Sequence, residues 1–193
     1  MTTKQLEKLL QQGEGIEIEF KTAHFDLNKD TFDSICAFLN RMGGHLLFGV
    51  NDNGKVEGVI ESSIPGMINN LITCANNPNK LNPPVYLAPQ VVEYDGKKII
   101  YLYVPESAHA HMSNGKIFDR NGDGDLDITR QSGFVSNLYL RKQPTNSEGK
   151  RQGFNIYPGS VKSSLAQKCH KIFTAISPVG FRTSEWPFAH GFA

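Results

Sequence analysis

The sequence predicts a mixed α/β fold (α+β mixed), with β-hairpins and about three helices packed in layers around one core. Segments with the apolar spacing of helices are separated by segments in which apolar residues alternate or run together, as in strands. Two pairs of strand-like segments are joined by Asn-Gly and Asp-Gly turns, which are typical of hairpins. Because hairpins make neighbouring strands antiparallel, a parallel doubly wound sheet is not predicted.

Three segments have the apolar spacing of amphipathic helices. Residues 3–12 form the first, and glycines follow it. Residues 29–42 carry the strongest apolar stripe, and Gly43-Gly44 ends that helix. Residues 64–75 are the third. These segments would supply the helical layer of the fold.

Strands are predicted between and after the helices. Residues 16–20 alternate Ile-Glu-Ile-Glu-Phe, so Glu17 and Glu19 are expected on the face opposite the apolar side chains. The other predicted strands are residues 45–50, 55–60, 85–93, 98–104, 116–118 and 138–141. The second and third form one hairpin, and the fourth and fifth form another.

Residues 1–143 are predicted to form one domain, because the pattern of helices and strands fades near Pro144. Residues 144–193 would then be a linker and a basic, aromatic C-terminal extension, with one helix at residues 161–176. The extension is too short for a core of its own. It packs on the domain, meets a partner such as a second copy in a homo-oligomer, or stays disordered.

The charge is balanced overall but divided along the chain. The 193 residues include 20 Lys+Arg and 19 Asp+Glu, for a formal net charge of +1. Residues 1–58 carry 6 basic and 9 acidic side chains, whereas residues 151–193 carry 5 basic and 1 acidic. The sum excludes a wholly basic coat protein and an acidic disordered tail. It leaves an acidic N-terminal region and a basic C-terminal end.

The cysteines and the apolar segments bear on location. Cys36, Cys74 and Cys169 are widely spaced and form no CxxC pair, so neither a zinc ribbon nor a disulfide framework is indicated. Reduced thiols fit a cytoplasmic location. The first residues lack the apolar stretch of a signal peptide, and no run approaches the roughly 20 apolar residues of a membrane helix. We therefore expect a cytoplasmic protein that does not contact the membrane.

Residues 14–21, EGIEIEFK, place three carboxylates and a lysine close together. Carboxylates at this spacing can bind a hard cation such as Mg²⁺ or Mn²⁺, with Asp52 as a further ligand if its turn folds nearby. The alternative is a strand edge exposed to solvent that carries a Glu–Lys ion pair. Spacing alone favours the alternative.

Two further segments carry charge patterns. The first matches the start of an EF-hand loop, but its twelfth position is Arg130 rather than a bidentate glutamate, so we expect an acidic turn in a hairpin and no calcium site. In the second, Tyr139 precedes Arg141 and Lys142, a mixture that suits phosphates and unpaired bases. The alternative for the second is a solvated strand end with a core tyrosine. The EF-hand-like side chains are Asp119, Asn121, Asp123 and Asp125.

Several spaced motifs occur in a fixed order: Glu14 to Lys21, Cys36 to Gly44, His45 to Asp52 and Val56 to Val59. Together they resemble the Schlafen AlbA_2 domain, also called divergent AAA-4 or Alba-2, over roughly residues 5–142. That family has an arginine-bearing strand near its end, which Arg120 matches. The resemblance implies a compact α/β domain that binds nucleic acid, often in bacterial transcriptional regulators.

The favoured hypothesis is therefore a nucleic-acid-binding, DNA-binding protein that regulates bacterial transcription and needs no cofactor for binding. The alternative, which the resemblance also implies, is an endoribonuclease that acts on structured RNA such as tRNA. It would hold Mg²⁺ or Mn²⁺ with the carboxylates of Glu14, Glu19 and Asp52. The candidate phosphate contacts for the first hypothesis are Lys21, Arg41, Arg120, Arg141 and Lys142.

Overall fold

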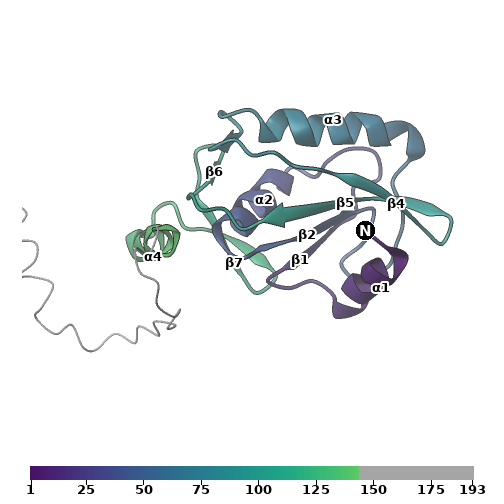
Figure 1. Ribbon diagram of the computed structural model, residues 1–193, viewed down its shortest axis with the longest axis horizontal. Coiled ribbons are helices and arrows are strands. Elements are labelled where there is room, and N and C mark those ends of the chain that lie inside the picture. Colours follow the sequence, from purple (N-terminus) through teal and green to yellow (C-terminus); the bar gives the residue numbers. More distant parts are fainter. Residues whose placement is uncertain (144–193) are drawn as a thin grey trace, which may run out of the picture. The chain divides into compact units, whose positions relative to one another are not determined.

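The computed structural model describes residues 1–143 (Figure 1). The predicted extension and its helix lie outside the described residues. No helix in the described part is long and apolar enough to span a bilayer. The helices are α1 (Thr3–Gln12), α2 (Thr31–Asn40), the 3-10 helix η1 (Glu61–Ser63), α3 (Ile64–Ala75) and α4 (Ser132–Lys142).

A four-stranded mixed sheet forms the centre of the domain, in the order β1-β2-β5-β4. β1 runs parallel to β2, and the other neighbours are antiparallel. Two short ladders, β3-β6 and β7-β8, complete the strands. The strands are β1 (Ile18–Lys21), β2 (Gly43–Phe48), β3 (Leu81–Asn82), β4 (Gln90–Tyr94), β5 (Lys97–Pro105), β6 (Met112–Ser113), β7 (Phe118–Asn121) and β8 (Gly124–Asp127). The mixed fold that the sequence predicts is confirmed.

One face of the central sheet is covered by α2 and α3. Leu46 and Phe48 of β2 alternate toward this side, as do Ile100, Leu102 and Val104 of β5, and all five are buried. They pack with the apolar faces of both helices in the larger of the two main cores. This face therefore offers no surface to a ligand.

The opposite face is covered only in part, by α1, and Figure 1 shows α1 and α3 on opposite sides of the sheet. Leu6 and Leu9 of α1 pack against Phe20, Leu47 and Ile99 in a second, smaller core. The rest of this face carries aromatic side chains that α1 does not cover.

Only residues 41 and 42 separate α2 from β2, and the first two residues of β2 are glycines. At Gly43 φ is +78°, and an added Cβ would lie 2.6 Å from the carbonyl oxygen of Val104. At Gly44 an added Cβ would lie 2.4 Å from the ring of Phe38. Because only glycine fits both positions, the chain reverses within two residues. The reversal places Arg41, at the end of α2, beside the end of the sheet.

The structure shows that two predicted strands were wrong. Residues 138–141 belong to α4, because Val135 and Leu138 have helical spacing and pack on Ile117 and Ile128 in a small third core. Residues 55–60 form only an isolated bridge, Val50 to Val56. β1 and β5 already occupy both edges of β2, so no edge remains for a hairpin partner.

The remaining elements keep their predicted type. α1 and α3 have the predicted bounds, and α2 is shorter than predicted. α4 brings the α-helices to four in residues 1–143, one more than expected. In the second hairpin, β4 begins at Gln90 rather than Val85. Pro89 explains the difference, because it lacks the N–H that a strand ladder needs and stands directly before β4.

Candidate nucleic-acid interface and the buried charge network

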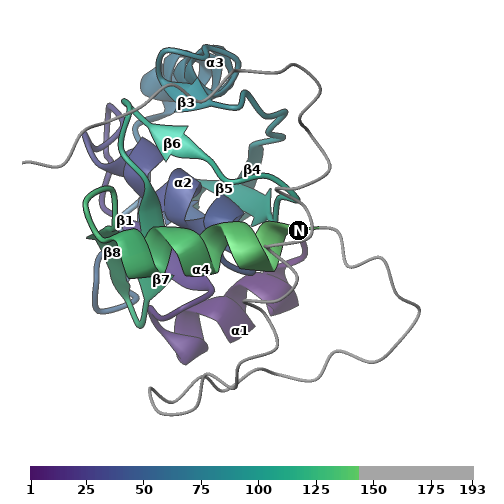
Figure 2. The same cartoon turned by 90° about the vertical axis from the view of Figure 1, so that its left-hand side faces the viewer.

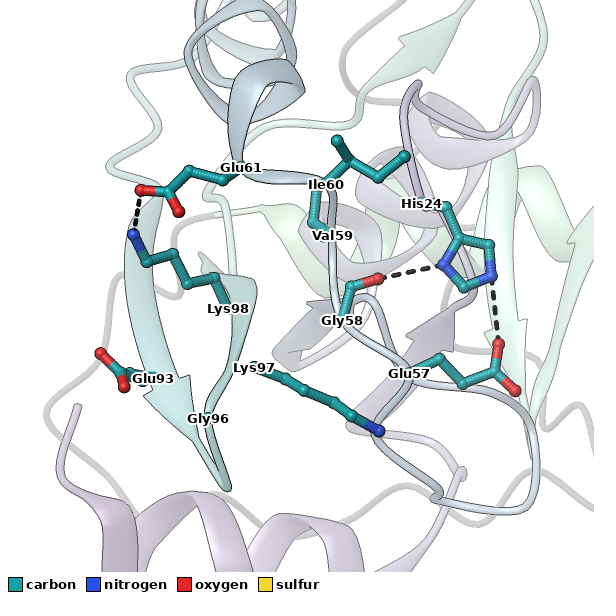
Figure 3. Close-up of a pocket in the computed structure, with 10 residues that line it drawn as sticks. All are labelled: His24, Glu57, Gly58, Val59, Ile60, Glu61, Glu93, Gly96, Lys97 and Lys98. Atoms are coloured by element: carbon teal, nitrogen blue, oxygen red, sulfur yellow. Dashed lines mark hydrogen bonds and ion pairs between the residues drawn. The ribbon is translucent and has the colours of Figure 1, made fainter.

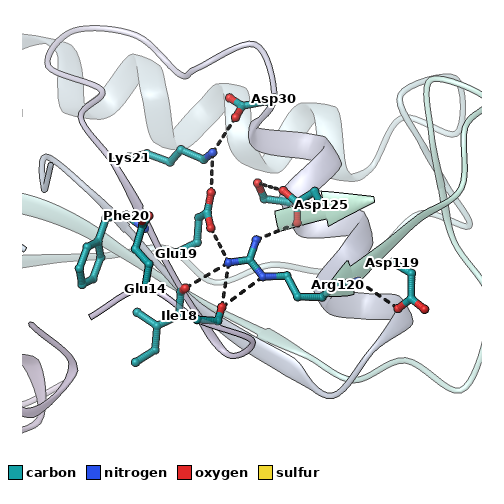
Figure 4. A network of polar contacts seen from close by, with 11 residues as sticks. Glu14, Ile18, Glu19, Phe20, Lys21, Asp30, Asp119, Arg120 and Asp125 are labelled. Carbon is teal, nitrogen blue, oxygen red and sulfur yellow. Dashed lines mark hydrogen bonds and ion pairs between the residues drawn. The ribbon is translucent and has the colours of Figure 1, made fainter. Parts of the chain in front are cut away.

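Arg120 of β7 is fully buried, at the centre of a network of charges (Figure 4). Its guanidinium donates to the carboxylates of Glu19, at 2.5 Å, and Asp125, at 2.8 Å. It also donates to the carbonyl oxygens of Gly15, at 2.8 Å, and Ile18, at 3.2 Å. Burial alone would lower the pKa of Arg120, but the two carboxylates outweigh burial and raise it. Arg120 is therefore a charged internal tie between β1 and the β7–β8 hairpin.

Lys21 extends this network on the other side of Glu19. Its ammonium lies 2.7 Å from the second oxygen of Glu19 and 2.6 Å from Asp30. Burial favours the neutral amine, yet these two partners raise the pKa of Lys21 above its usual value. Because Lys21 and Arg120 are buried and paired, neither presents a donor to a phosphate on the surface, and we leave both out of the interface.

The three carboxylates predicted as metal ligands lie near one another. Burial is the main cause of a raised pKa at Glu14, and the charges of Glu19 and Asp52 raise it further. A backbone hydrogen bond from Phe20, 2.9 Å from the Glu14 carboxylate, acts in the opposite direction. The set thus shares one electrostatic environment.

This set does not fit a divalent cation as it is arranged. Both oxygens of Glu19 are bound, one by Lys21 and one by Arg120, so an ion would have to displace one of those cations. Among residues 1–143 no group of three Asp, Glu, His or Cys side chains is placed to hold a metal ion. Of the carboxylates predicted for Mg²⁺ or Mn²⁺, Glu19 serves the internal ion pairs and Glu14 accepts from the backbone N–H of Phe20.

The EF-hand-like segment folds as the β7–β8 hairpin, as expected. Two of its aspartates bind arginines. Asp125 accepts from Arg120, and its other oxygen accepts from the hydroxyl of Ser34 at 2.6 Å. Asp119 is buried and accepts from two other arginines. The aspartates of the hairpin therefore bind arginine side chains of the same chain.

Three of the predicted phosphate contacts, Arg41, Arg141 and Lys142, converge at the end of α2, and we call them the basic cluster. Arg41 and Arg141 each donate an Nη2 to the same oxygen of Asp119, at 2.8 Å and 3.0 Å. Lys142 donates to the carboxylate of Glu106 at 3.3 Å. Figure 2 shows how this arises, because α4 runs across the end of the domain beside β7 and β8.

The basic cluster also completes the C-terminus of α2. Lys142 donates to the carbonyl oxygen of Leu39 at 3.1 Å, and Arg141 donates to that of Asn40 at 3.4 Å. Cations are stabilising at this end of a helix because its carbonyls carry partial negative charge. Burial lowers the pKa of Lys142, and the neighbouring charge of Arg141 lowers it further.

The two arginines of the cluster are accessible, whereas Lys142 is 5% exposed and adds its charge without presenting a donor at the surface. The side chains of Arg41 and Arg141 are 29% and 37% exposed. Among the described residues each guanidinium uses only its Nη2 group. The Nε of Arg41 is buried, so Arg41 keeps only Nη1 for a ligand, whereas Arg141 keeps further N–H donors. Phe134, Tyr139 and Leu140 are exposed on the same helix as Arg141. Tyr139 is therefore not the core tyrosine of the alternative interpretation.

An aromatic groove lies on the open part of the sheet, and sequence reasoning did not assign it. Its volume is about 560 Å³, and α1 forms one wall. His45, Tyr101 and Tyr103 lie along it. The alternation Ile-Tyr-Leu-Tyr in residues 100–103 was the available signal, because it places both tyrosines on one face of a strand.

A second hollow, of about 360 Å³, lies beside the loop that precedes η1 (Figure 3). His24 bridges the carbonyl oxygen of Gly58, at 3.0 Å, and the carboxylate of Glu57, at 3.2 Å. Lys97 donates to the carbonyl oxygen of Val56, and Lys98 pairs with a glutamate. Since these polar groups satisfy one another, we assign the hollow no ligand.

Comparisons with known proteins match residues 14–129 to the family model Schlafen, AlbA_2. Among solved structures, the chain is similar to the DIP2311 protein from Corynebacterium diphtheriae, with 17% identity and a TM-score of 0.46 over 65% of this chain and 26% of that one. It is also similar to the N-terminal domain of a Nitrosomonas europaea protein named as related to the ATP-dependent DNA helicase RecG. There the identity is 20% and the TM-score 0.41, over 84% of this chain and 91% of that domain. No curated protein matches.

Proposed function

The chain belongs to the Schlafen AlbA_2 family, and on that premise we propose that it binds nucleic acid through the basic cluster. One observation carries the proposal. Arg41 and Arg141 lie far apart in the sequence, yet their guanidinium groups meet at one aspartate and stay accessible. A structural ion pair needs only one arginine, so the N–H donors that the two side chains do not use within the protein are available to a ligand.

The chemistry of the cluster suits phosphate. Three cations face only two carboxylates, Asp119 and Glu106, which leaves an excess of positive charge. A guanidinium offers several N–H donors in a planar fork, which matches the oxygens of a phosphate. Phe134 and Tyr139 lie exposed on the same helix, where they can contact a sugar or a base. Binding of this kind weakens steeply as salt rises.

Regulation of bacterial transcription is the finer proposal. It requires that the chain prefer DNA to RNA, since a regulator acts at a DNA site. The support for it is family membership, and a comparison of ligands provides the test.

The experiment is a fluorescence anisotropy titration of the full chain at salt concentrations from about 50 to 200 mM. The labelled ligands are single-stranded DNA, single-stranded RNA and duplex DNA, each about 20 nucleotides long per strand. We expect binding at low salt that is largely lost at high salt. No binding to any of the three at low salt would contradict the proposed function. Preference for RNA would remove the role in transcription and keep the binding.

A metal-dependent endoribonuclease is the alternative. The charges of Glu19 and Asp52 contribute to the raised pKa of Glu14, which favours it, and the pairing of Glu19 with Lys21 and Arg120 opposes it. We expect no cleavage when the chain is incubated with a tRNA pool and Mn²⁺ or Mg²⁺. Asp52 is exposed, so Asp52→Asn leaves the fold intact. Cleavage that this substitution abolishes would establish the nuclease.

A further inference from the structure

We propose that the aromatic groove binds an unpaired nucleobase of a single-stranded nucleic acid. This proposal rests on the proposed function and deepens it, because it names the form of nucleic acid that the chain prefers. The groove is separate from the basic cluster: its walls are α1 and the open face of β2 and β5, whereas the cluster lies at the end of α2.

Three aromatic rings line the groove as one surface. His45 of β2 is the register partner of Tyr103 of β5, and Tyr101 lies two residues earlier on the same face. The ring centres of His45 and Tyr103 are 5.2 Å apart, and those of His45 and Tyr101 are 5.8 Å apart with the planes within 23°. Tyr103 is 49% exposed, so part of this surface is open to stacking.

A hydrogen bond holds two of the rings in place. The Nδ1 atom of His45 and the hydroxyl of Tyr101 are 2.8 Å apart. Burial raises the pKa of Tyr101 and lowers that of His45, so at neutral pH a phenol meets a neutral imidazole. The phenol then donates to Nδ1, and the remaining proton of His45 is on Nε2. Because this pair is fixed before a ligand arrives, little ordering cost opposes stacking.

The walls of the groove carry groups suited to a base and its phosphate. One face of α1 presents Gln5, Lys8 and Gln12, spaced three and four residues apart. Across the groove lie Gln90 and Glu17. The amide oxygens of Gln5 and Gln90 already accept from residues 2 and 1, so these side chains offer N–H donors to the edge of a base. The amide of Gln12 can donate and accept, and the carboxylate of Glu17 can accept from an exocyclic amine. A volume of about 560 Å³ accommodates a nucleotide-sized ligand.

Continuity with the basic cluster identifies the occupant as a nucleic-acid strand. His45 follows Arg41 by four residues, which is at most about 13 Å along an extended chain. On the neighbouring strand, Tyr103 lies three residues before Glu106, the partner of Lys142. A short single strand can therefore place a phosphate at the cluster and a base in the groove. Amide and charged side chains stand beside the aromatic rings in this lining, which suits a nucleotide better than the apolar face of a second copy.

The test is an anisotropy titration of the full chain at low salt with a labelled single strand of about 20 nucleotides and with a duplex of the same sequence. The variant is Tyr103→Ala, and Tyr103→Phe should behave as the wild type because it keeps the ring. Tyr86→Ala is the matched control, since Tyr86 is 96% exposed and outside the groove. We expect Tyr103→Ala to weaken single-strand binding roughly tenfold and to leave duplex binding unchanged.

Each result decides the proposal. If the wild type binds a single strand and Tyr103→Ala binds it equally well, the groove is not the site, although the proposed function stands. If the wild type binds no nucleic acid, both the proposed function and the base-binding proposal are overturned. If Tyr103→Ala alters only the mass of the protein in light scattering, the groove is a contact between copies of the chain, and the base-binding proposal is overturned.

Discussion

Arg120 and Arg141 both bind aspartates of the β7–β8 hairpin, yet their surroundings are opposite. The side chain of Arg120 is 0% exposed and that of Arg141 is 37% exposed. The guanidinium of Arg120 makes five hydrogen bonds to four partners within the protein. Arg141 uses one of its nitrogens on the described residues. The comparison shows that an ion pair alone does not reveal the role of an arginine; the donors that remain free reveal it.

The energetic consequences differ in the same way. A buried charge pair stabilises little on its own, but removal of one partner leaves the other charged, buried and unpaired. An ion pair on the surface contributes little in either case, because water and salt screen it. The buried network therefore acts on stability, and the exposed arginines are free to act on binding.

The largest expected effect is that of Arg120→Met. It leaves Glu19 and Asp125 without their main partner, so we expect the free energy of unfolding to fall by about 3–5 kcal/mol. Urea unfolding followed by circular dichroism measures this loss. Arg141→Met is the control, with an expected loss below about 1 kcal/mol because Arg41 still binds Asp119. If both variants lost the same unfolding free energy, the buried charge network and the exposed arginines would not differ in their effect on stability.

The next largest effect is a dependence of stability on pH, which arises from the buried, neutral imidazole of His111. Burial lowers the pKa of His111 to about 4. The ring lies 2.9 Å from the carbonyl oxygen of Pro83 and 2.7 Å from the hydroxyl of Ser107. In the unfolded chain the imidazole of His111 is protonated as the pH falls below about 6.5. In the folded chain it stays neutral until about pH 4.

Stability should therefore be constant above about pH 6.5 and fall by on the order of 3 kcal/mol as the pH drops toward 4. Unfolding free energies across this range, compared with those of His111→Asn, isolate the contribution. If both proteins lose the same stability, His111 does not carry the effect, and its burial matters less to stability than the structure indicates.

The exposed arginines should alter binding with little effect on stability. Arg41→Ala and Arg141→Ala should each weaken binding to all sequences and reduce the slope of log K against log salt by about 1. Lys55→Ala is the matched control, since Lys55 is an exposed cation in the turn beyond the other end of β2. Salt titrations of the four proteins give the slopes. If Lys55→Ala changed the affinity and the salt slope as much as the arginine variants do, the overall charge of the protein would determine binding, and the basic cluster would not.

The smallest effect is expected at Glu14. Its pKa is raised, so the charged form is disfavoured in the folded chain and the folded chain binds a proton more readily than the unfolded chain. Glu14→Gln should thus stabilise the protein slightly at neutral pH, and the gain should vanish at acid pH where the wild-type carboxyl is protonated. Denaturation at both pH values measures this. If the stability gained by Glu14→Gln increased toward acid pH, the pKa of Glu14 would be lowered in the folded chain, contrary to this prediction.

Local patterns gave the sequence predictions that proved correct. α1, α3 and the β4–β5 hairpin follow from apolar spacing and a turn, which are properties of neighbouring residues. Residues 138–141 were wrongly predicted as a strand because the helix that contains them depends on packing against Ile117 and Ile128. Contacts between distant segments decide such cases, and spacing does not encode them.

The site shows the same limit. The order of residues makes Lys21, Arg120 and Arg141 equivalent cations, and only the tertiary structure divides them into buried and exposed. Glu19 alternates with apolar residues and was expected to face water if it bound no cation. Arg120 lies against it, and both faces of β1 are buried. The groove likewise depends on how much of the sheet α1 covers.

The central claim is that an exposed arginine binds nucleic acid while a buried one holds the fold. The most direct measurement is the binding affinity of Arg141→Ala for a labelled nucleic acid at low salt, with its unfolding free energy measured in the same buffer. We predict an affinity several-fold below that of the wild type, with stability lowered by less than about 1 kcal/mol. Unchanged affinity in a stable, folded variant would contradict the claim.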